Sequence, residues 1–473
     1  MKQKFTHHQV LSLAVFVLFI SIPKISWSAE PTARAWQDLE EEAIRLLSRY
    51  VQIDTTNPPG NEIHAARFFK EIFDREGIDA KIIESAPGRG NIYARVRGNG
   101  AKPAVVLMNH MDVVPADPRQ WKEPPFGGVM KDGYLWGRGT LDMKGPAIVE
   151  LMTVLALKRN QVRLQGDVIF LGTADEEAGG ALGAGFLLKQ HPELFEGVGL
   201  VLNEGGGIRL GENGNARFYS LGVTEKTPLW LRLTAKGTAG HGSTPGRNSP
   251  VNRLVAALSR IMQFQTPMKV LPHVQKYYAE TAHLQAAHLR KPYADLMSAL
   301  QDAAFATEFT KDARSNASVR NTIAVTMIKG SDKVNVIPAQ ASAEIDVRLL
   351  PGEDPNAFIE ELRQVIGDNS IKIDVTLSFP PATSPEHPEA LRAIKALARA
   401  HDGDVPVVAP LGRGFTDCRF FRERRIPCYG FIPMGSAAAG ENLVHGVDER
   451  VSLVNLRQAL RMMQELVIKL VAD

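Results

Sequence analysis

The chain has 473 residues, of which 44% are hydrophobic and 23% are charged, as in soluble globular proteins. This length exceeds what one ordinary core organises and therefore predicts two domains. The formal net charge of +3 comes from Lys2, Lys4 and Lys24, and residues 29–473 hold 52 basic and 52 acidic side chains. This balance argues against nucleic acid or an anionic membrane as a partner.

Residues 1–28 have the outline of a secretory signal peptide. Lys2 and Lys4 precede the apolar run 10–22, which is short for a membrane span, and small residues around Ser28 suit cleavage. We therefore expect a secreted or periplasmic protein without stable membrane association after cleavage. An uncleaved N-terminal anchor is the alternative.

Helices and strands alternate through residues 39–224. The hydrophobic periodicity predicts four helices, over 39–51, 62–76, 146–157 and 182–189. It predicts five strands, over 80–83, 91–96, 104–108, 167–171 and 199–202. This rhythm predicts an α/β fold, with a sheet that has helices on both faces.

The pattern changes near Thr224. Strands are predicted over 229–235, 322–328, 341–349 and 372–377, and helices over 251–264, 355–366 and within the helix-rich stretch 270–303. Two main helices over antiparallel strands suit an α+β unit inserted into the first domain. A predicted helix, strand and helix then follow at 388–399, 427–432 and 453–470. We expect one domain of 29–224 with 379–473, and an inserted domain of 225–378.

Acidic and imidazole side chains gather just after predicted strands or before predicted helices. They are His110, Asp112, Asp142, Glu176, Glu177, Glu204 and His445. Ligands of an open α/β sheet bind beyond the carboxyl ends of its strands, and imidazole and carboxylate groups are ligands for a divalent metal such as zinc. Any one of these residues alone is more simply a solvated loop residue or, for Asp142, a helix cap. Together they predict a metal site.

The segments that carry these residues resemble the M20 family of co-catalytic zinc metallopeptidases and aminoacylases. The motifs are H-x-D-V-V-P at 110–115, W-x-x-x-P-F at 121–126, G-R-G-x-x-D-M-K-G at 137–145 and D-E-E at 175–177. They are most similar to the carboxypeptidase S and aminoacylase branch, and the resemblance runs from about residue 39 to the C-terminus. It implies a zinc-peptidase-like catalytic domain, with a mixed sheet flanked by helices, and an inserted α+β lid or dimerisation domain.

The resemblance also implies a pair of zinc ions, for which cobalt or manganese could substitute. By matching position, Asp142 would bridge the two ions. His110 and Glu204 would complete one site, and Glu177 and His445 would complete the other. Each ion would then have three protein ligands and an open position for water, as a catalytic site needs.

Two further carboxylates have roles implied by the same motifs. Glu176 matches the general base, which takes a proton from water and passes it to the leaving amine. Asp112 matches a residue that orients the His110 imidazole. Glu204 stands where aminopeptidase members of the family carry Asp, which favours enzymes that cleave an amide next to a free α-carboxylate.

The inserted unit supplies a second group of resemblances. His241, in G-H-G-S-T-P at 240–245, resembles the lid histidine that stabilises the oxyanion, and it would act in a neighbouring subunit's site if the lid forms a homodimer. Asn335 and Arg348 match residues that hold the substrate carboxylate, which a guanidinium binds bidentately. As simpler alternatives, His241 caps a turn and Arg348 pairs with Glu344 or Asp346.

Three features leave alternatives open. Arg413 departs from the glycine- or serine-rich form of its loop and either adds a second cation for an acidic substrate or faces water. The stretch 270–303 either caps the pocket or widens a dimer contact. Cys418 and Cys428 can pair in an oxidising compartment, but Cys428 lies in an apolar strand-like run, so we favour two buried free thiols.

The sequence thus predicts an exported two-domain di-zinc hydrolase. It would cleave a peptide or N-acyl amino acid with a free carboxylate. The alternatives are a deacylase or deacetylase of a non-peptide amide, and an exported metal- or peptide-binding protein without turnover.

Overall fold

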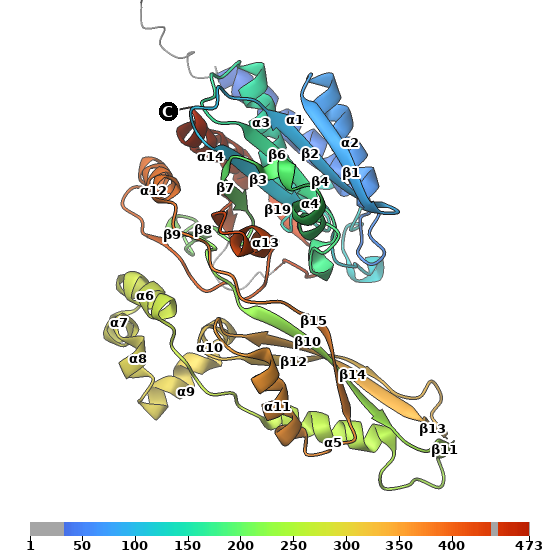
Figure 1. Ribbon diagram of the computed structural model, residues 1–473. Coiled ribbons are helices and arrows are strands. Elements are labelled where there is room, and N and C mark those ends of the chain that lie inside the picture. The colour runs from blue at the N-terminus through green and yellow to red at the C-terminus, as the bar shows by residue number, and fades with distance from the viewer. Residues whose placement is uncertain (1–32, 437–442, 473) are drawn as a thin grey trace, which may run out of the picture.

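A six-stranded sheet forms the centre of the larger part of the molecule in a computed structural model, which describes residues 33–436 and 443–472 (Figure 1). Its strands, in spatial order, are β1 (Asp79–Ala86), β2 (Arg89–Val96), β6 (Val168–Thr173), β3 (Ala104–His110), β7 (Val198–Asn203) and β17 (Cys428–Gly430). Strands β6, β3, β7 and β17 are parallel to one another, whereas β2 runs antiparallel to both of its neighbours, β1 and β6. The predicted signal peptide, residues 1–28, lies outside the described residues.

Helices cover both faces of this sheet, as predicted. Every residue of β3 and β6 is buried, which requires cover on both sides. Val105 and Leu107 of β3 face one core, and Val106 and Met108 face the other. The helices of the first core are α1 (Ala33–Val51), α2 (Glu62–Arg75), α3 (Lys144–Arg159), α12 (Pro388–Asp402) and α14 (Leu453–Val471), and those of the second are α4 (Ala184–Gln190) and α13 (Cys418–Glu423).

Helix α1 begins six residues before the predicted start at 39. Trp36, which precedes that position, packs against the first core and gives the extra turns an apolar anchor. No helix within residues 33–436 and 443–472 combines the length and apolar character that crossing a membrane requires.

A second, antiparallel sheet forms the inserted α+β unit (Figure 1). Its strands, in spatial order, are β12 (Thr322–Lys329), β14 (Gln340–Leu349), β10 (Thr227–Lys236) and β15 (Lys372–Ser378). Buried and less buried residues alternate along β14, so one face of the sheet packs on a core. Helices α5 (Pro250–Gln263) and α11 (Pro355–Ile366) cover that face with Leu254, Leu258 and Leu362.

A helical segment with its own small core lies between α5 and β12 in sequence and extends beyond the predicted stretch 270–303. Its helices are α6 (Pro272–Thr281), α7 (Ala287–Ala294), α8 (Leu296–Ala299), α9 (Ala303–Lys311) and α10 (Ala313–Val319). The rings of Tyr278 and Phe309 pack at a tilt in its core, with centroids 5.3 Å apart, and Leu411, from the part of the chain that returns to the larger sheet, belongs to the same core. The segment is therefore anchored to the α/β part of the molecule.

Three small sheets complete the fold. One contains β4 (Val129–Lys131), β5 (Tyr134–Trp136) and β19 (Arg450–Ser452), the second contains β16 (Val407–Val408), β9 (Ala216–Ser220), β8 (Gly207–Leu210) and β18 (Gly435–Ser436), and the third pairs β11 (Gly240–His241) with β13 (Val336–Ile337). Because β19 pairs with β5, residues near 450 lie beside the 137–145 motif.

Cys418 and Cys428 form a disulfide, so the prediction of two free thiols was wrong. The Cα atoms lie 5.4 Å apart and both residues are fully buried. The apolar run around Cys428 does place it in a strand, but β17 brings it against the first residue of α13. Burial, which we took as a sign of a free thiol, is equally compatible with a buried disulfide.

We expect the double substitution Cys418→Ala/Cys428→Ala to destabilise the protein by about 2 to 3 kcal/mol, because the bond closes a loop of about ten residues. Calorimetry of this variant beside the wild type checks the loss as a lower melting temperature. Two titratable thiols in the unfolded, unreduced wild type would contradict the disulfide itself.

Candidate metal centre and active site

Parallel strands bring the predicted ligands to one edge of the larger sheet. His110 is the last residue of β3, and Glu204 directly follows β7. Glu176 and Glu177 follow β6 after a two-residue turn. Because β6, β3 and β7 are parallel neighbours, their carboxyl ends meet at this edge.

Asp142 lies at the centre of the cluster. Its Oδ1 is 2.9 Å from His110 Nε2, and its Oδ2 is 3.1 Å from His445 Nε2. His445 Nε2 is also 3.2 Å from Glu177 Oε1, and His110 Nε2 is 3.6 Å from Glu204 Oε1. Each oxygen of Asp142 thus faces one imidazole, and each imidazole faces a further carboxylate.

The hydrogen bonding of His110 determines which of its ring nitrogens is available to bind a metal ion. Its Nδ1 lies 2.9 Å from the carbonyl oxygen of Asp112, which can only accept, so Nδ1 carries the proton. Nε2 then faces Asp142 and Glu204, and in the neutral imidazole it is the nitrogen that can bind a metal ion. A hydrogen bond of this kind on the far nitrogen orients a metal-binding imidazole.

The Asp112 side chain links His110 to the two glutamates. Its Oδ1 and Oδ2 accept hydrogen bonds from the backbone N–H groups of Glu176 and Glu177, both at 3.1 Å. Asn57 Nδ2 donates to Oδ2 at 2.8 Å. The backbone carbonyl of Asp112, rather than its carboxylate, is the closer partner of the imidazole, at 2.9 Å against 3.5 Å.

The turn before Glu176 depends on Asp175, the first residue of the D-E-E motif, and on two residues that the motifs did not indicate, Glu62 and Arg89. Asp175 has a φ of 72°, in the left-handed region that Asp tolerates better than most residues. Arg89 Nη2 donates to Asp175 Oδ1 at 3.0 Å and to Glu62 Oε1 at 2.7 Å, and all three are largely buried. Nothing in the sequence pairs positions 62, 89 and 175, since they come from three separate elements.

Glu449 holds the loop that carries Asp142, and it also was not predicted. This fully buried carboxylate accepts from Arg138 Nη1 at 2.7 Å and from the backbone N–H groups of Gly139, Leu141 and Asp142 at 2.8 to 3.2 Å. The arginine and glycine of the 137–145 motif thereby gain a structural explanation. The only sign of Glu449 in the sequence was that an acidic residue lies four positions after His445.

The donor set fits divalent cations. Burial raises the pKa of Glu176, Glu177 and Glu204, and neighbouring carboxylates raise it further. Glu176 Oε1 is buried, and no partner for it lies within the described residues. Such crowding of carboxylates is unfavourable without a cation and favourable with one. Two sets of ligand atoms, from His110, Asp142 and Glu177 and from His110, Glu176 and Glu204, each lie within 4.8 Å of one another.

A cavity of about 990 Å³ opens from this cluster toward the inserted unit. Asp142, Glu176, Glu177, Glu204 and His445 line one end. Its walls also include side chains from the inserted sheet, from the helical segment and from the loop after β16, namely Trp230, Tyr277, Tyr278, Tyr293, Arg314, Arg348, Arg413 and Phe415. The helical segment therefore forms a wall of the pocket. This is the first of the two roles that the sequence left open for the stretch 270–303.

Arg348 lies on the wall of this cavity. Its Nε and Nη2 donate to Asp346 at 2.7 and 3.0 Å, as the simpler alternative anticipated. Its guanidinium also lies over the ring of Phe415, 5.1 Å from the centroid. Nη1, however, is buried, and no acceptor for it lies in the described part of the chain. Arg348 thus retains one donor that a ligand in the cavity can use.

His241 and Asn335 are not brought to the cluster of their own chain. They lie side by side at the tip of the inserted unit, where β11 pairs with β13 and Gly242 N–H donates to the Asn335 carbonyl (Figure 1). His241 is exposed and its Nδ1 is 2.7 Å from Ser243 Oγ. Neither residue lines the 990 Å³ cavity.

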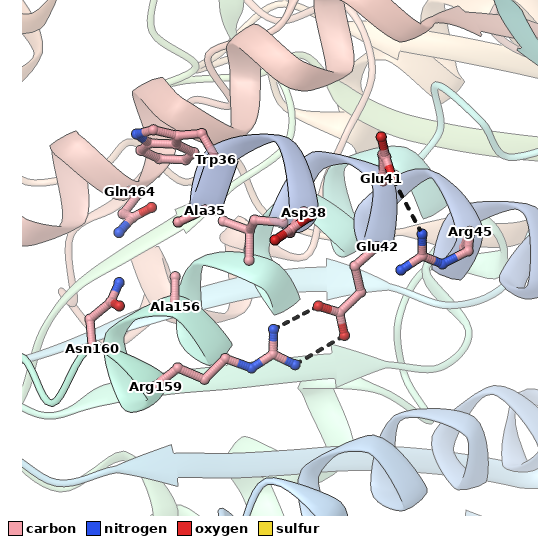
Figure 2. Close-up of a pocket in the computed structure, with 11 residues that line it drawn as sticks. Ala35, Trp36, Asp38, Glu41, Glu42, Arg45, Ala156, Arg159, Asn160 and Gln464 are labelled. Carbon is pink, nitrogen blue, oxygen red and sulfur yellow. Dashed lines mark hydrogen bonds and ion pairs between the residues drawn. The ribbon is translucent and has the colours of Figure 1, made fainter. Parts of the chain in front are cut away.

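A second hollow, of about 480 Å³, lies between α1, α3 and α14 (Figure 2). Four of its charged groups form two pairs: Arg159 donates to both oxygens of Glu42, and Arg45 lies within 4.0 Å of Glu41. Trp36 and Gln464 line the same hollow, which holds no histidine. We assign it no chemistry.

Comparisons with known proteins agree with this geometry. The model of Peptidase family M20/M25/M40 matches residues 106–469. The chain is 30% identical over 386 residues to the human N-fatty-acyl-amino acid synthase/hydrolase PM20D1, covering 78% of this chain and 75% of that protein. It is 30% identical over 389 residues to a probable succinyl-diaminopimelate desuccinylase of Staphylococcus aureus strain Mu50, covering 81% and 88%.

The fold is shared with a solved structure. The M20 family metallo-carboxypeptidase Sso-CP2 of Sulfolobus solfataricus superposes with a TM-score of 0.69, at 21% identity, over 91% of this chain and 99% of that chain. The mixed sheet flanked by helices and the inserted α+β unit therefore occur together in both proteins.

Proposed function

Because the chain belongs to Peptidase family M20/M25/M40 and is a hydrolase of its peptidase and aminoacylase type, we propose that it is a di-zinc enzyme that cleaves peptides or N-acyl amino acids next to a free carboxylate. The observation that carries this proposal is the placement of Asp142 between His110 and His445, with each of its oxygens facing one imidazole.

The residues that would hold the metal ions are those of the cluster. Asp142 would be shared, His110 and Glu204 would complete one site, and Glu177 and His445 the other. Imidazole and carboxylate ligands in this number suit zinc and leave room for a substrate. When bound, the ions supply Lewis-acid chemistry that activates water and polarises the scissile carbonyl.

Glu176 would be the general base. It stands beside the ligands, and its buried Oε1 is free to take the proton of the attacking water and give it to the leaving nitrogen. Asp112 would position Glu176, since the Asp112 carboxylate accepts the backbone N–H of Glu176 and the Asp112 carbonyl accepts a hydrogen bond from His110 Nδ1. Arg348 would bind the substrate carboxylate through Nη1.

His241 and Asn335 would act on the site of a partner subunit, because the fold places them at the tip of the lid, away from their own cluster. His241 would donate a hydrogen bond to the oxyanion that forms at the scissile carbonyl. Asn335, beside it, would contact the carboxylate end of the substrate.

The test of the proposed function is a panel of dipeptides and N-acyl amino acids, with metal content measured on the same samples. We expect hydrolysis that needs the free α-carboxylate, so that the corresponding carboxamides are poor substrates. Hydrolysis of non-peptide amides without a carboxylate would favour the deacylase alternative. Stoichiometric zinc with no turnover on any member of the panel would favour a binding protein.

Subunit complementation tests the place of His241. We expect His241→Ala and Glu176→Gln each to be nearly inactive. A 1:1 mixture of the two should regain up to about a quarter of wild-type activity, since about half of the dimers are then mixed and one of the two sites in each mixed dimer is intact. Mixtures of Glu176→Gln with Asp142→Asn serve as the control, because both changes affect the same chain's cluster. Verified mixed dimers without recovered activity would contradict a shared site.

We also propose export by cleavage of the signal peptide at residues 1–28. The disulfide Cys418–Cys428 supports this, since such bonds form in oxidising compartments. Mass spectrometry of the N-terminus of protein recovered from the cell envelope or medium is the test. An intact Met1 in that material would indicate the anchored alternative.

A further inference from the structure

Several arginine side chains line the cavity that contains the metal cluster. We propose that the substrate carries a second negatively charged group, besides the carboxylate at Arg348, and that Arg209, Arg314 and Arg413 bind it. This inference rests on the proposed function of the same site and names the class of its substrate: a peptide or N-acyl amino acid with an additional carboxylate.

The three arginines converge from separate parts of the chain. Arg209 lies on β8, Arg314 on α10 of the helical segment, and Arg413 in the loop after β16, and all three line the cavity that contains Glu176 and Arg348. Such convergence does not follow from a run of basic residues in the sequence. It is a property of the cavity.

Their charges are close enough to affect one another. Burial lowers the pKa of Arg209 and of Arg413, and repulsion from Arg314 is the next largest cause for both. The Arg413 side chain is exposed to solvent, but protein groups lie around it at a greater distance. This is expected of a side chain that faces an open cavity. Guanidinium groups held together in this way favour an anion among them.

Two of these arginines, Arg314 and Arg413, form no ion pair with a carboxylate of the described residues. Asp312 also lines the cavity and offsets part of the charge on Arg413, but its carboxylate accepts the Ser315 N–H at 2.7 Å and caps α10. Arg314 and Arg413 therefore line the cavity without an ion-pair partner in the described part of the chain.

Two further contacts join parts of the cavity wall near the arginines in sequence. Arg217 has a structural contact in the cavity wall: its Nη2 donates to the Leu284 carbonyl at 2.8 Å and links β9 to the helical segment. Phe218 and Tyr277 meet edge to face, with ring centroids 6.2 Å apart.

Two pairs of substrates test the inference, each differing only by a carboxylate against a carboxamide. They are N-succinyl-leucine with N-succinamoyl-leucine, and N-acetyl-glutamate with N-acetyl-glutamine, which separate an acidic acyl part from an acidic amino acid side chain. We expect at least one pair to show a preference of about tenfold or more in kcat/KM for the acid, as charge-assisted hydrogen bonds give.

Arginine variants locate the source of that preference. Arg314→Gln and Arg413→Gln should reduce it to about twofold or less, Arg413→Lys should keep part of it, and Arg392→Gln, an exposed arginine on α12, should keep all of it. Calorimetric binding of the same four compounds to the Glu176→Gln protein provides a readout that does not depend on turnover.

The outcomes separate this inference from the proposed function. Hydrolysis of all four compounds with no preference, or a preference that persists in Arg314→Gln and Arg413→Gln, would overturn the inference and leave the hydrolase standing. No hydrolysis of any of them by zinc-loaded protein would count against the hydrolase. In that case, the calorimetric comparison of acid with amide would still decide whether the arginines bind an anion.

Discussion

Replacing Glu176 by Gln should lower kcat by about 10²- to 10⁴-fold, the usual contribution of a general base, while leaving the metal content unchanged. The amide has the shape of the carboxylate but cannot take a proton. The cluster should tolerate the change, because Glu176 is held by its backbone N–H on Asp112 and its Oε1 makes no hydrogen bond within the described residues.

Steady-state kinetics and metal analysis on the same preparation check this expectation. Glu71→Gln on the exposed face of α2 is the matched control and should behave as the wild type. If Glu176→Gln lost both metal and activity, Glu176 would be a ligand and another residue would have to serve as the base. Full activity in the variant would refute the mechanism.

Asp142→Asn should remove both metal and activity. Each carboxylate oxygen of Asp142 faces one imidazole, whereas an amide offers one acceptor oxygen and turns an NH₂ donor toward the other histidine. We expect a loss of metal affinity beyond the roughly 10- to 100-fold that follows removal of a residue that only orients a ligand.

Dialysis against a graded chelator series, followed by metal analysis, measures this loss. Asp38→Asn, an exposed carboxylate on α1, has the same change of charge and should not alter zinc content. Retention of two ions per chain by Asp142→Asn would show that Asp142 is not shared between them.

This cluster shows how much of the candidate site could be predicted from the sequence. Each of His110, Glu176, Glu177 and Glu204 follows a strand whose apolar run is plain in the sequence, and parallel neighbouring strands bring their ends together. Family motifs supplied Asp142 and His445, which lie in loops without such a pattern. The predicted family and fold class were confirmed.

What the sequence determined by itself was local: hydrophobic periodicity specified most helices and strands, and the motifs indicated the residues of the candidate site. Only the tertiary structure decided the long-range pairs, among them Glu449 with the Asp142 loop, Asp175 with Arg89, and Cys418 with Cys428. It also decided that His241 lies away from its own cluster and that three arginines face one cavity. The physical reason is that periodicity records which face of an element is buried, whereas the partner of a polar or charged side chain depends on how distant elements pack.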